Sequence, residues 1–158
     1  MEIAIRRAVL SDAAIACSLV CQSIKELCVA DHKGDESTIT AWLANKSESS
    51  FCRWITSAQH VALVAERRGE ILGFGLLNRT GKLALLYVAP MARLEGISTS
   101  LLVALEEEAI ALGLKQISLE SSITAKRFYQ ARGYHSSGDP VAGFGVTDAY
   151  PMVKHIAP

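Results

Sequence analysis

Residues 93–99 form the segment of this chain best suited to hold an anionic ligand. Its sequence is Arg93-Leu94-Glu95-Gly96-Ile97-Ser98-Thr99. The segment follows an apolar, strand-like run at 83–88 and leads directly into a helical pattern. At the start of a helix the backbone N–H groups lack helical partners and the helix dipole is positive, so a phosphate or pyrophosphate binds well there. Gly96 allows a ligand to approach the backbone closely, and the guanidinium of Arg93 matches a phosphate.

The same turn has other interpretations. A strand can lead through glycine into a helix with no ligand, and Arg93 can be a solvated side chain beside Glu95. The turn lacks the Lys-Ser/Thr pair of a P-loop and the three spaced glycines of a dinucleotide site, which disfavours ATP and NAD. A phosphate-binding α/β protein unrelated to these classes stays open on this segment alone.

A second segment of the chain helps to decide among these interpretations of the turn. It reads Ser122-Ile123-Thr124-Ala125-Lys126-Arg127-Phe128-Tyr129-Gln130-Ala131-Arg132-Gly133-Tyr134. Together the two segments resemble the GNAT superfamily of acyl-CoA-dependent N-acetyltransferases over about residues 60–137. Residues 88–98 are similar to its pyrophosphate motif, Val-x-Pro-x-x-(Arg/Gln)-x-x-Gly-x-(Gly/Ala), and residues 122–134 to Asn-x-x-Ala-x-x-Phe-Tyr-x-x-x-Gly-Phe. Two positions depart from the pattern: Ser98 replaces a glycine and Ser122 replaces the common asparagine, and neither change removes backbone donors.

The resemblance implies acetyl-CoA as cosubstrate and no metal. Backbone amides of a splayed central strand would hold the acetyl and pantetheine groups, and the turn would hold the pyrophosphate. The residues expected to bind acetyl-CoA are Leu86, Tyr87, Val88, Arg93, Leu94, Glu95, Gly96, Ile97, Ser98, Thr99 and Ser122. Of Glu95, only the backbone is expected to make contact. Leu86 and Val88 can also be simple β-core residues.

The resemblance also assigns catalytic roles. Tyr129 matches the tyrosine that protonates the CoA thiolate in many GNAT enzymes, and a phenol with a pKa near 10 is a suitable acid. The alternative is that Tyr129 only packs beside Phe128, which is expected in the core. Glu120 is a candidate general base, because it ends a strand just before the second motif. A water chain could replace it, so no single base is named.

The acceptor is expected to be a small-molecule or peptide amine bound near Asp31 and His32. These residues lie in a polar stretch, 31–35, which follows the first predicted helix and borders the acceptor pocket of GNAT proteins. His32 has a suitable intrinsic pKa for a base, although a histidine in a loop is more often just solvated. The loop 138–150 is expected to close over the pocket, and with Asp31 its acids Asp139 and Asp148 would suit a cationic amine. A non-catalytic acyl-CoA sensor of the same fold is the alternative function.

Size and composition fit one folded domain with a single core. The chain has 158 residues, is half hydrophobic, and carries 16 Lys and Arg against 16 Asp and Glu. This balance predicts no nucleic-acid or anionic-membrane partner. No apolar run approaches the ~20 residues that span a bilayer, and a signal-peptide core is missing, so a cytoplasmic location is expected. Its 4 cysteines, of which Cys17 and Cys21 are four residues apart, read as small buried hydrophobes. Assembly as a homodimer is left open.

The hydrophobic pattern predicts the elements that position these residues. Strands are expected at 1–8, 61–66, 71–77, 83–88, 116–119, from 133 and at 150–156. Helices are expected at about 13–28 with Ser11-Asp12 as cap, 38–44 with Ser37 as cap, 51–57, 95–112 ending at Gly113, and 124–131. An antiparallel meander followed by βαβ units is a mixed α/β (α+β) order, which GNAT proteins share. We therefore expect a single domain over residues 1–158, with a mostly antiparallel, twisted central sheet that contains a splayed parallel pair and is flanked by helices.

Overall fold

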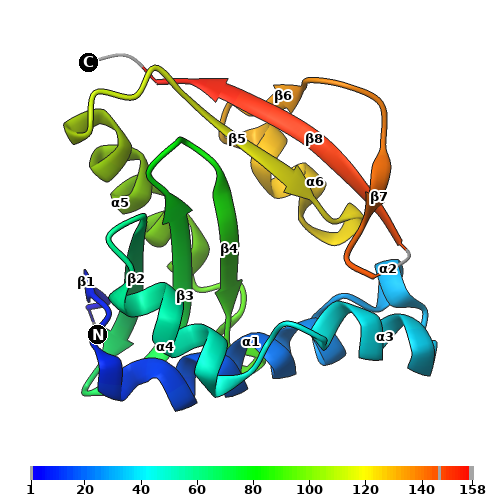
Figure 1. Ribbon diagram of the computed structural model, residues 1–158, viewed down its shortest axis with the longest axis horizontal. Helices are drawn as coiled ribbons and strands as arrows, with labels where there is room; N and C mark the ends of the chain where they lie inside the picture. The colour runs from blue at the N-terminus through cyan, green and yellow to red at the C-terminus, as the bar shows by residue number, and fades with distance from the viewer. Residues whose placement is uncertain (1, 146, 157–158) are drawn as a thin grey trace.

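The computed structural model describes residues 2–145 and 147–156, which fold into two β-sheets flanked by helices (Figure 1). The elements in chain order are β1 (Ala4–Arg7), the 3-10 turn η1 (Leu10–Asp12), α1 (Ala13–Leu27), α2 (Val29–His32), α3 (Glu36–Leu43), α4 (Glu48–Thr56), β2 (His60–Arg67), β3 (Glu70–Asn78), β4 (Leu83–Val88), the 3-10 turn η2 (Pro90–Ala92), α5 (Ile97–Ala111), β5 (Gln116–Ser121), α6 (Ile123–Ala131), β6 (His135–Ser136), β7 (Val141–Gly143) and β8 (Thr147–His155). In the part of the chain that is described, no helix has the length and apolar character needed to cross a membrane.

The first sheet is an antiparallel meander in the order β1-β2-β3-β4. Its central strand β3 carries Gly73 and Gly75 on the face that meets α5. A Cβ atom at either glycine would lie 2.7 Å from a leucine side chain of α5, Leu101 or Leu105. Glycine at these two positions therefore lets α5 pack directly against the strand. The opposite face carries Phe74, whose ring lies 5.3 Å from that of Phe51 in α4.

The second sheet is built from the C-terminal part of the chain, with β8 between β5 and β6 and with β7 also paired to β8. Within the residues that the structure describes, the two sheets meet at one isolated parallel bridge, between Lys82 and Ser118. From there β4 and β5 diverge, as Figure 1 shows. The mixed α/β fold with a splayed parallel pair is thus confirmed, and the unpaired backbone of β4 faces the opening.

Three local predictions differ from the structure. The polar stretch after α1 contains the short helix α2, so Asp31 and His32 are helical rather than in a loop. Helix α3 is capped by Asp35 and not by Ser37, because the Asp35 carboxylate accepts the Thr38 N–H at 2.9 Å. The glycine-rich loop before the last strand contains β7. The short elements α2 and β7 gain their stability from contacts with distant parts of the chain, whereas the Asp35 cap is a local contact.

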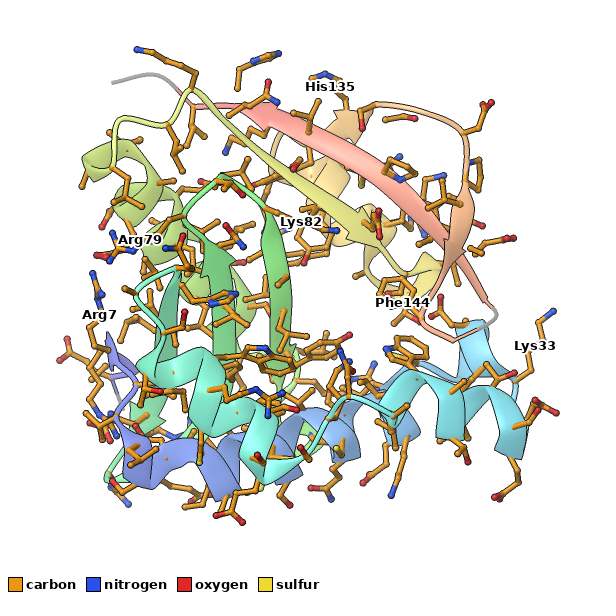
Figure 2. All side chains as sticks on the ribbon, viewed as in Figure 1. Arg7, Lys33, Arg79, Lys82, His135 and Phe144 are labelled. Carbon is orange, nitrogen blue, oxygen red and sulfur yellow. The ribbon has the colours of Figure 1, made fainter. Side chains whose placement is uncertain are left out.

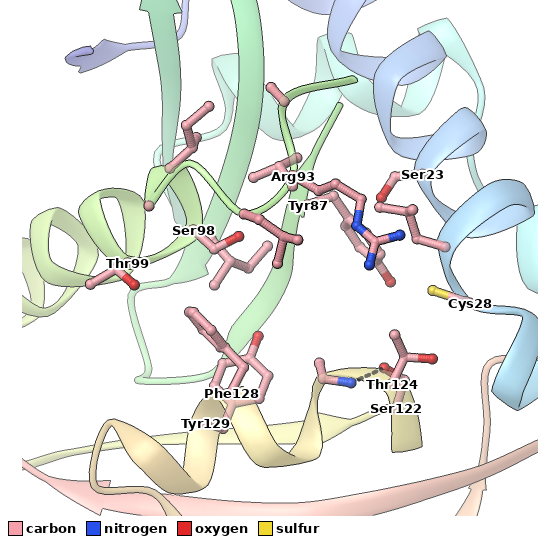
Figure 3. Close-up of a pocket in the computed structure, with 18 of the residues that line it drawn as sticks. Ser23, Cys28, Tyr87, Arg93, Ser98, Thr99, Ser122, Thr124, Phe128 and Tyr129 are labelled. Carbon is pink, nitrogen blue, oxygen red and sulfur yellow. Dashed lines mark hydrogen bonds between the residues drawn. The ribbon is translucent and has the colours of Figure 1, made fainter. Parts of the chain in front are cut away.

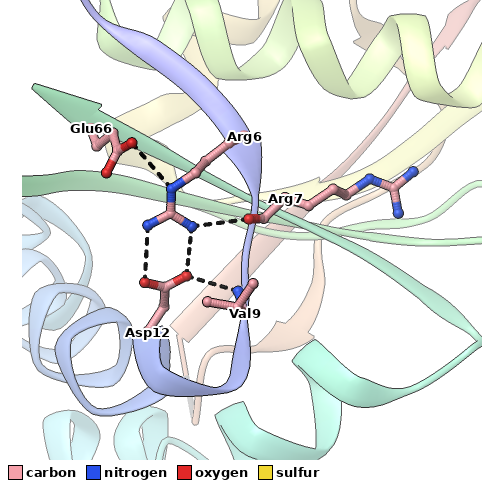
Figure 4. A network of polar contacts seen from close by, with 5 residues as sticks. All are labelled: Arg6, Arg7, Val9, Asp12 and Glu66. Carbon is pink, nitrogen blue, oxygen red and sulfur yellow. Dashed lines mark hydrogen bonds and ion pairs between the residues drawn. The ribbon is translucent and has the colours of Figure 1, made fainter. Parts of the chain in front are cut away.

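The entry to α1 is held by an ion-pair cluster instead of the predicted side-chain cap (Figure 4). The carboxylate of Asp12 is buried and forms two hydrogen bonds with the Arg6 guanidinium, at 2.8 and 3.1 Å. It also accepts the Val9 N–H at 2.8 Å. Arg6 in turn pairs with Glu66 of β2 at 3.2 Å. The cluster ties α1 to the first two strands, and the hydrogen bonds from Arg6 hold the pKa of Asp12 below its usual value.

Candidate active site

Helix α5 begins at a glycine that leaves its first backbone amides free. Gly96 is the N-cap residue, has a left-handed conformation with φ of 81°, and no side chain caps the helix. A Cβ atom at Gly96 would meet no other atom within 4 Å, so the space in front of the helix is open. The Glu95 carboxylate turns away to pair with Arg67 at 2.6 Å. The start of α5 is therefore an open, electropositive backbone site.

This site forms one end of a cleft with a volume of about 460 Å³. The cleft is bounded by α1, β4, the segment from η2 into α5, and α6 (Figure 3). Of the residues predicted to bind acetyl-CoA, all except Glu95 line this cleft: Leu86, Tyr87, Val88, Arg93, Leu94, Gly96, Ile97, Ser98, Thr99 and Ser122. The structure thus brings together residues from two segments that are far apart in the sequence.

Helix α6 forms the wall opposite α1, and Ser122 begins it. The Ser122 hydroxyl accepts the Ala125 N–H at 3.2 Å, which makes it the N-cap of α6. Asparagine and serine are both strong N-cap residues. The serine at the position where the motif commonly has asparagine therefore keeps the same local hydrogen bond.

Tyr129 lies on α6 with its ring packed and its hydroxyl at the cleft. Its side chain is buried, and its ring contacts those of Phe128 and Tyr134 in edge-on arrangements with centroids 5.3 and 5.5 Å away. Among the described residues no side chain or backbone group hydrogen-bonds to its hydroxyl, although Tyr129 lines the cleft. Burial raises the pKa of Tyr129 above its ordinary value, so the phenol stays protonated at neutral pH. Packing and proton donation are compatible in this arrangement.

The sequence interpretation missed Arg132, which lines the cleft from the end of α6. Its Nε and Nη2 atoms donate to the Thr99 hydroxyl at 3.0 and 2.8 Å, and its guanidinium lies 4.0 Å from the centre of the Phe128 ring. Within the described residues, neither Arg132 nor Arg93 has a carboxylate partner. Two unpaired cations therefore flank the start of α5. The helical spacing from Tyr129 to Arg132 places both on one face of α6, a signal that the sequence contained.

A smaller cavity, of about 40 Å³, opens where β4 and β5 separate. It shares five lining residues with the main cleft, so the two cavities are neighbours: Leu86, Tyr87, Ser122, Ala125 and Tyr129. Glu120 lines this smaller cavity, and its carboxylate lies 3.8 Å from the Lys82 ammonium near the bridge between the sheets. A base at Glu120 would therefore act from the side opposite α1.

An aromatic wall closes the same region. Phe144, from the turn between β7 and β8, lies between the second sheet and α3 (Figure 2). Its ring stacks on that of Trp42 in α3 with centroids 4.8 Å apart. The Trp42 indole N–H is buried without a hydrogen-bond partner among the described residues. The predicted closing loop thus contributes an aromatic side chain to the opening between β4 and β5.

Asp31 and His32 lie outside the main cleft and line a separate, polar cavity between α2 and β8. Both ring nitrogens of His32 are engaged: Nδ1 accepts the Gly34 N–H at 3.0 Å, and Nε2 lies 3.0 Å from the Ile24 carbonyl. The ring therefore ties α2 to the end of α1. Asp31 accepts hydrogen bonds from the first turn of α6. Neither residue is poised as a base at the cleft.

Comparison with known proteins agrees with this geometry. The family model of the acetyltransferase (GNAT) domain matches residues 28–156. A GCN5-related N-acetyltransferase from Rhodopseudomonas palustris is 27% identical with a TM-score of 0.87, over 98% of this chain and 96% of that one. The PaiA N-acetyltransferase from Thermoplasma acidophilum, solved in complex with coenzyme A, is 21% identical with a TM-score of 0.82, over 98% and 99%. The Salmonella typhimurium protein yncA, solved with its cofactor acetyl-CoA, is 18% identical with a TM-score of 0.76, over 99% and 95%.

A search of curated protein sequences found no significant match. The domain match covers most of the chain, and the fold, the free start of α5 and the opening between β4 and β5 agree with it. This protein belongs to the GNAT acetyltransferase family.

Proposed function

We propose that this protein is an N-acetyltransferase that moves the acetyl group of acetyl-CoA to a primary amine by direct attack in a ternary complex. One observation carries the proposal. A single cleft joins the uncapped start of α5, a site for a pyrophosphate, to the free hydroxyl of Tyr129, a proton donor. An anion site and an acid in one cleft are what thioester transfer from CoA requires.

The residues of the cleft fit acetyl-CoA at both ends. The amides of Ile97, Ser98 and Thr99 begin α5 without a side-chain cap, and Arg93 and Arg132 add two cations beside them. This arrangement suits a pyrophosphate. Further along, the cleft is lined by β4, and among the described residues its edge toward β5 has one bridge, at Lys82 just before the strand. Its free backbone groups suit the amides of pantetheine. The relatives solved with coenzyme A and acetyl-CoA support the same ligand.

When bound, acetyl-CoA supplies the acetyl thioester that is transferred. Backbone amides of β4 polarise the thioester carbonyl and hold it for attack. The nitrogen of a neutral amine forms the new C–N bond as the C–S bond breaks, and Tyr129 donates its proton to the departing sulfur. The amine loses one proton, either to Glu120 through the smaller cavity or to water. Tyr129 then regains a proton from solvent.

Direct attack is favoured over an acetyl-cysteine intermediate. Cys28 is the cysteine that lines the cleft, and its side chain is buried. Burial raises the pKa of Cys28 to about 12. The thiolate is the nucleophilic form of cysteine, and at neutral pH this thiol stays protonated. The cleft therefore supplies an acid, Tyr129, but no activated sulfur nucleophile among its described residues.

A two-part experiment tests the proposal. Calorimetry with CoA and acetyl-CoA measures whether the cleft binds the nucleotide, and 3′-dephospho-CoA should bind nearly as well, because α5 addresses the pyrophosphate. A panel of amines, comprising amino acids, polyamines, aminoglycosides and peptide N-termini, is then screened for release of free CoA thiol. Amine-dependent release is the expected result. Tight binding of acetyl-CoA with no release across the panel would instead identify an acyl-CoA sensor, and no CoA binding by folded protein would refute both functions.

A further inference from the structure

Asp31, in the short helix α2, makes a polar contact with the start of α6 beside the cleft. Its carboxylate accepts the Ile123 N–H at 2.7 Å and the Thr124 N–H at 3.3 Å, and it also accepts the Thr124 hydroxyl. The partners are 92 and 93 residues away in the sequence. All three donors belong to the first turn of α6, the helix that carries Tyr129.

These contacts complete the capping of α6. The first amides of a helix have no helical acceptor. In α6 the first two, of Ile123 and Thr124, are taken by Asp31, and the third, of Ala125, is taken by the Ser122 hydroxyl. A carboxylate at this end is also favoured by the helix dipole. Helix α6 therefore depends on a residue of α2, distant in the sequence, to complete its N-terminus.

The contact lies at the edge of the cleft that holds the proposed ligand. Cys28, which immediately precedes α2, lines the cleft on the α1 side, and Thr124 lines it on the α6 side. Asp31 lies one turn beyond Cys28, contacts Thr124 and lines the neighbouring polar cavity. At the other end of α6, Arg132 donates to Thr99 of α5. Both ends of α6 are thus held by side-chain contacts with the walls that face it.

We propose that Asp31 is a positioning residue that fixes the width of the acetyl-CoA cleft and the placement of Tyr129, and that it does not bind the acceptor amine. This inference rests on the proposed acetyl-CoA function. The Asp31 carboxylate is occupied by three donors, so little of it is left for an ammonium group. Loss of the contact releases the start of α6, which lets the two walls separate and moves the Tyr129 hydroxyl from the reacting sulfur.

The chain offers a matched control in Asp35. Its carboxylate also accepts three donors, the Thr38 N–H, the Thr38 hydroxyl and the Ser37 hydroxyl, at 2.7–2.9 Å. It caps α3 locally and joins no two walls of the cleft. Asp31→Ala and Asp35→Ala each remove one carboxylate, three hydrogen bonds and a helix cap. The thermal stabilities of the two variants should fall by similar amounts, and only Asp31→Ala should alter the cleft.

The test compares these two variants and Asp31→Asn with the unmodified protein. Asp31→Ala should weaken CoA binding by roughly 2- to 30-fold, the range that corresponds to loss of a helix cap, and should lower kcat with an active amine. Asp31→Asn keeps a carbonyl oxygen that accepts one N–H, so it should be intermediate. Hydrogen exchange at the Ile123 and Thr124 amides should accelerate in Asp31→Ala without ligand. Asp35→Ala should keep the CoA affinity and kcat of the unmodified protein.

Two results would overturn the positioning role. If Asp31 attracts a cationic amine, Asp31→Ala and Asp31→Asn will behave alike, the amine KM alone will rise, and the difference will fade with added salt as the Debye length shrinks from ~10 Å at 0.1 M to ~3 Å at 1 M. If Asp31→Ala matches Asp35→Ala in every measurement, the contact is only stabilising. Failure of the unmodified protein to bind CoA would refute the proposed function itself, which separates the two hypotheses.

Discussion

Tyr129 combines a packed ring with a hydroxyl group that is free to act as a proton donor in the cleft. The ring contacts those of Phe128 and Tyr134, and Tyr129 lines both the main cleft and the cavity between β4 and β5. Because burial raises the pKa of Tyr129 above 10, the group is protonated throughout the neutral range. It can donate a proton to a thiolate at neutral pH, but it cannot act as a phenolate base there.

Replacing Tyr129 with phenylalanine should separate its two roles. Tyr129→Phe keeps the ring and removes the hydroxyl, so acetyl-CoA affinity should be nearly unchanged by calorimetry. Turnover of an active amine should fall by about 10²–10⁴, the usual contribution of acid–base catalysis. In the unmodified enzyme, no alkaline loss of kcat from this group should appear below pH 10, since its pKa is raised from that value. Full turnover by the variant would leave Tyr129 with a packing role only.

Tyr134→Phe is the matched control for this variant. Tyr134 touches Tyr129, but its hydroxyl donates to Glu106 of α5 at 2.8 Å, and Glu106 also pairs with Lys154 of β8 at 3.1 Å. Loss of this part-buried hydrogen bond should lower the free energy of unfolding by about 1–2 kcal/mol. Turnover should stay near that of the unmodified protein. If Tyr134→Phe loses as much turnover as Tyr129→Phe, the loss in Tyr129→Phe reflects disturbed packing rather than the missing proton donor.

At the scale of elements, the proposed binding of acetyl-CoA depends on the start of α5. Gly96 adopts φ of 81°, where alanine is strained by roughly 1–2 kcal/mol. Gly96→Ala should therefore destabilise the protein slightly. It should also weaken CoA binding strongly, because the new methyl group enters the open space where a pyrophosphate would approach the amides.

Gly113 provides the control for backbone strain. It follows the other end of α5, has φ of 80°, and a Cβ atom placed there would likewise meet no other atom within 4 Å. Gly113→Ala should lower thermal stability about as much as Gly96→Ala and leave CoA affinity unchanged. Equal CoA affinities for both variants in calorimetry would mean that the ligand binds elsewhere.

The elements also show what the sequence could predict. The strand at 83–88 and the helix that follows Gly96 were predicted closely, because apolar periodicity and glycine act locally. The cleft residues of these elements follow from the same motifs. The sequence did not predict the partners of Asp31 and Arg132, because the contacting residues are 92 and 33 positions away in the chain. Nothing in the local sequence of Asp31 distinguishes an acid that faces solvent from one that caps a distant helix.

At the scale of the whole molecule, the cluster of Arg6, Asp12 and Glu66 links stability to pH. The pKa of Asp12 is lowered by Arg6 in the folded protein, so its contribution to stability is present above the unfolded value of 3.8 and is lost as pH falls through the folded value. Asp12→Asn should lower the free energy of unfolding at pH 7 by about 1–3 kcal/mol. The difference from the unmodified protein should shrink below about pH 4. Urea unfolding at pH 7, 5, 3 and 2 measures it, and a difference that is constant with pH would contradict this assignment.

The division of the strands between two sheets has a consequence for the order of folding. The first sheet uses only residues 4–88, and the second uses only residues 116–155, with a single bridge between them among the described residues. Neither sheet needs a strand from the other half, so each half can assemble from its own residues, although Ala4 of β1 pairs with the distant Glu66 of β2. During synthesis the first sheet can form while the last third of the chain is still on the ribosome. The cleft draws one wall from each half, so it is completed last, when α6 docks and Asp31 meets its first turn.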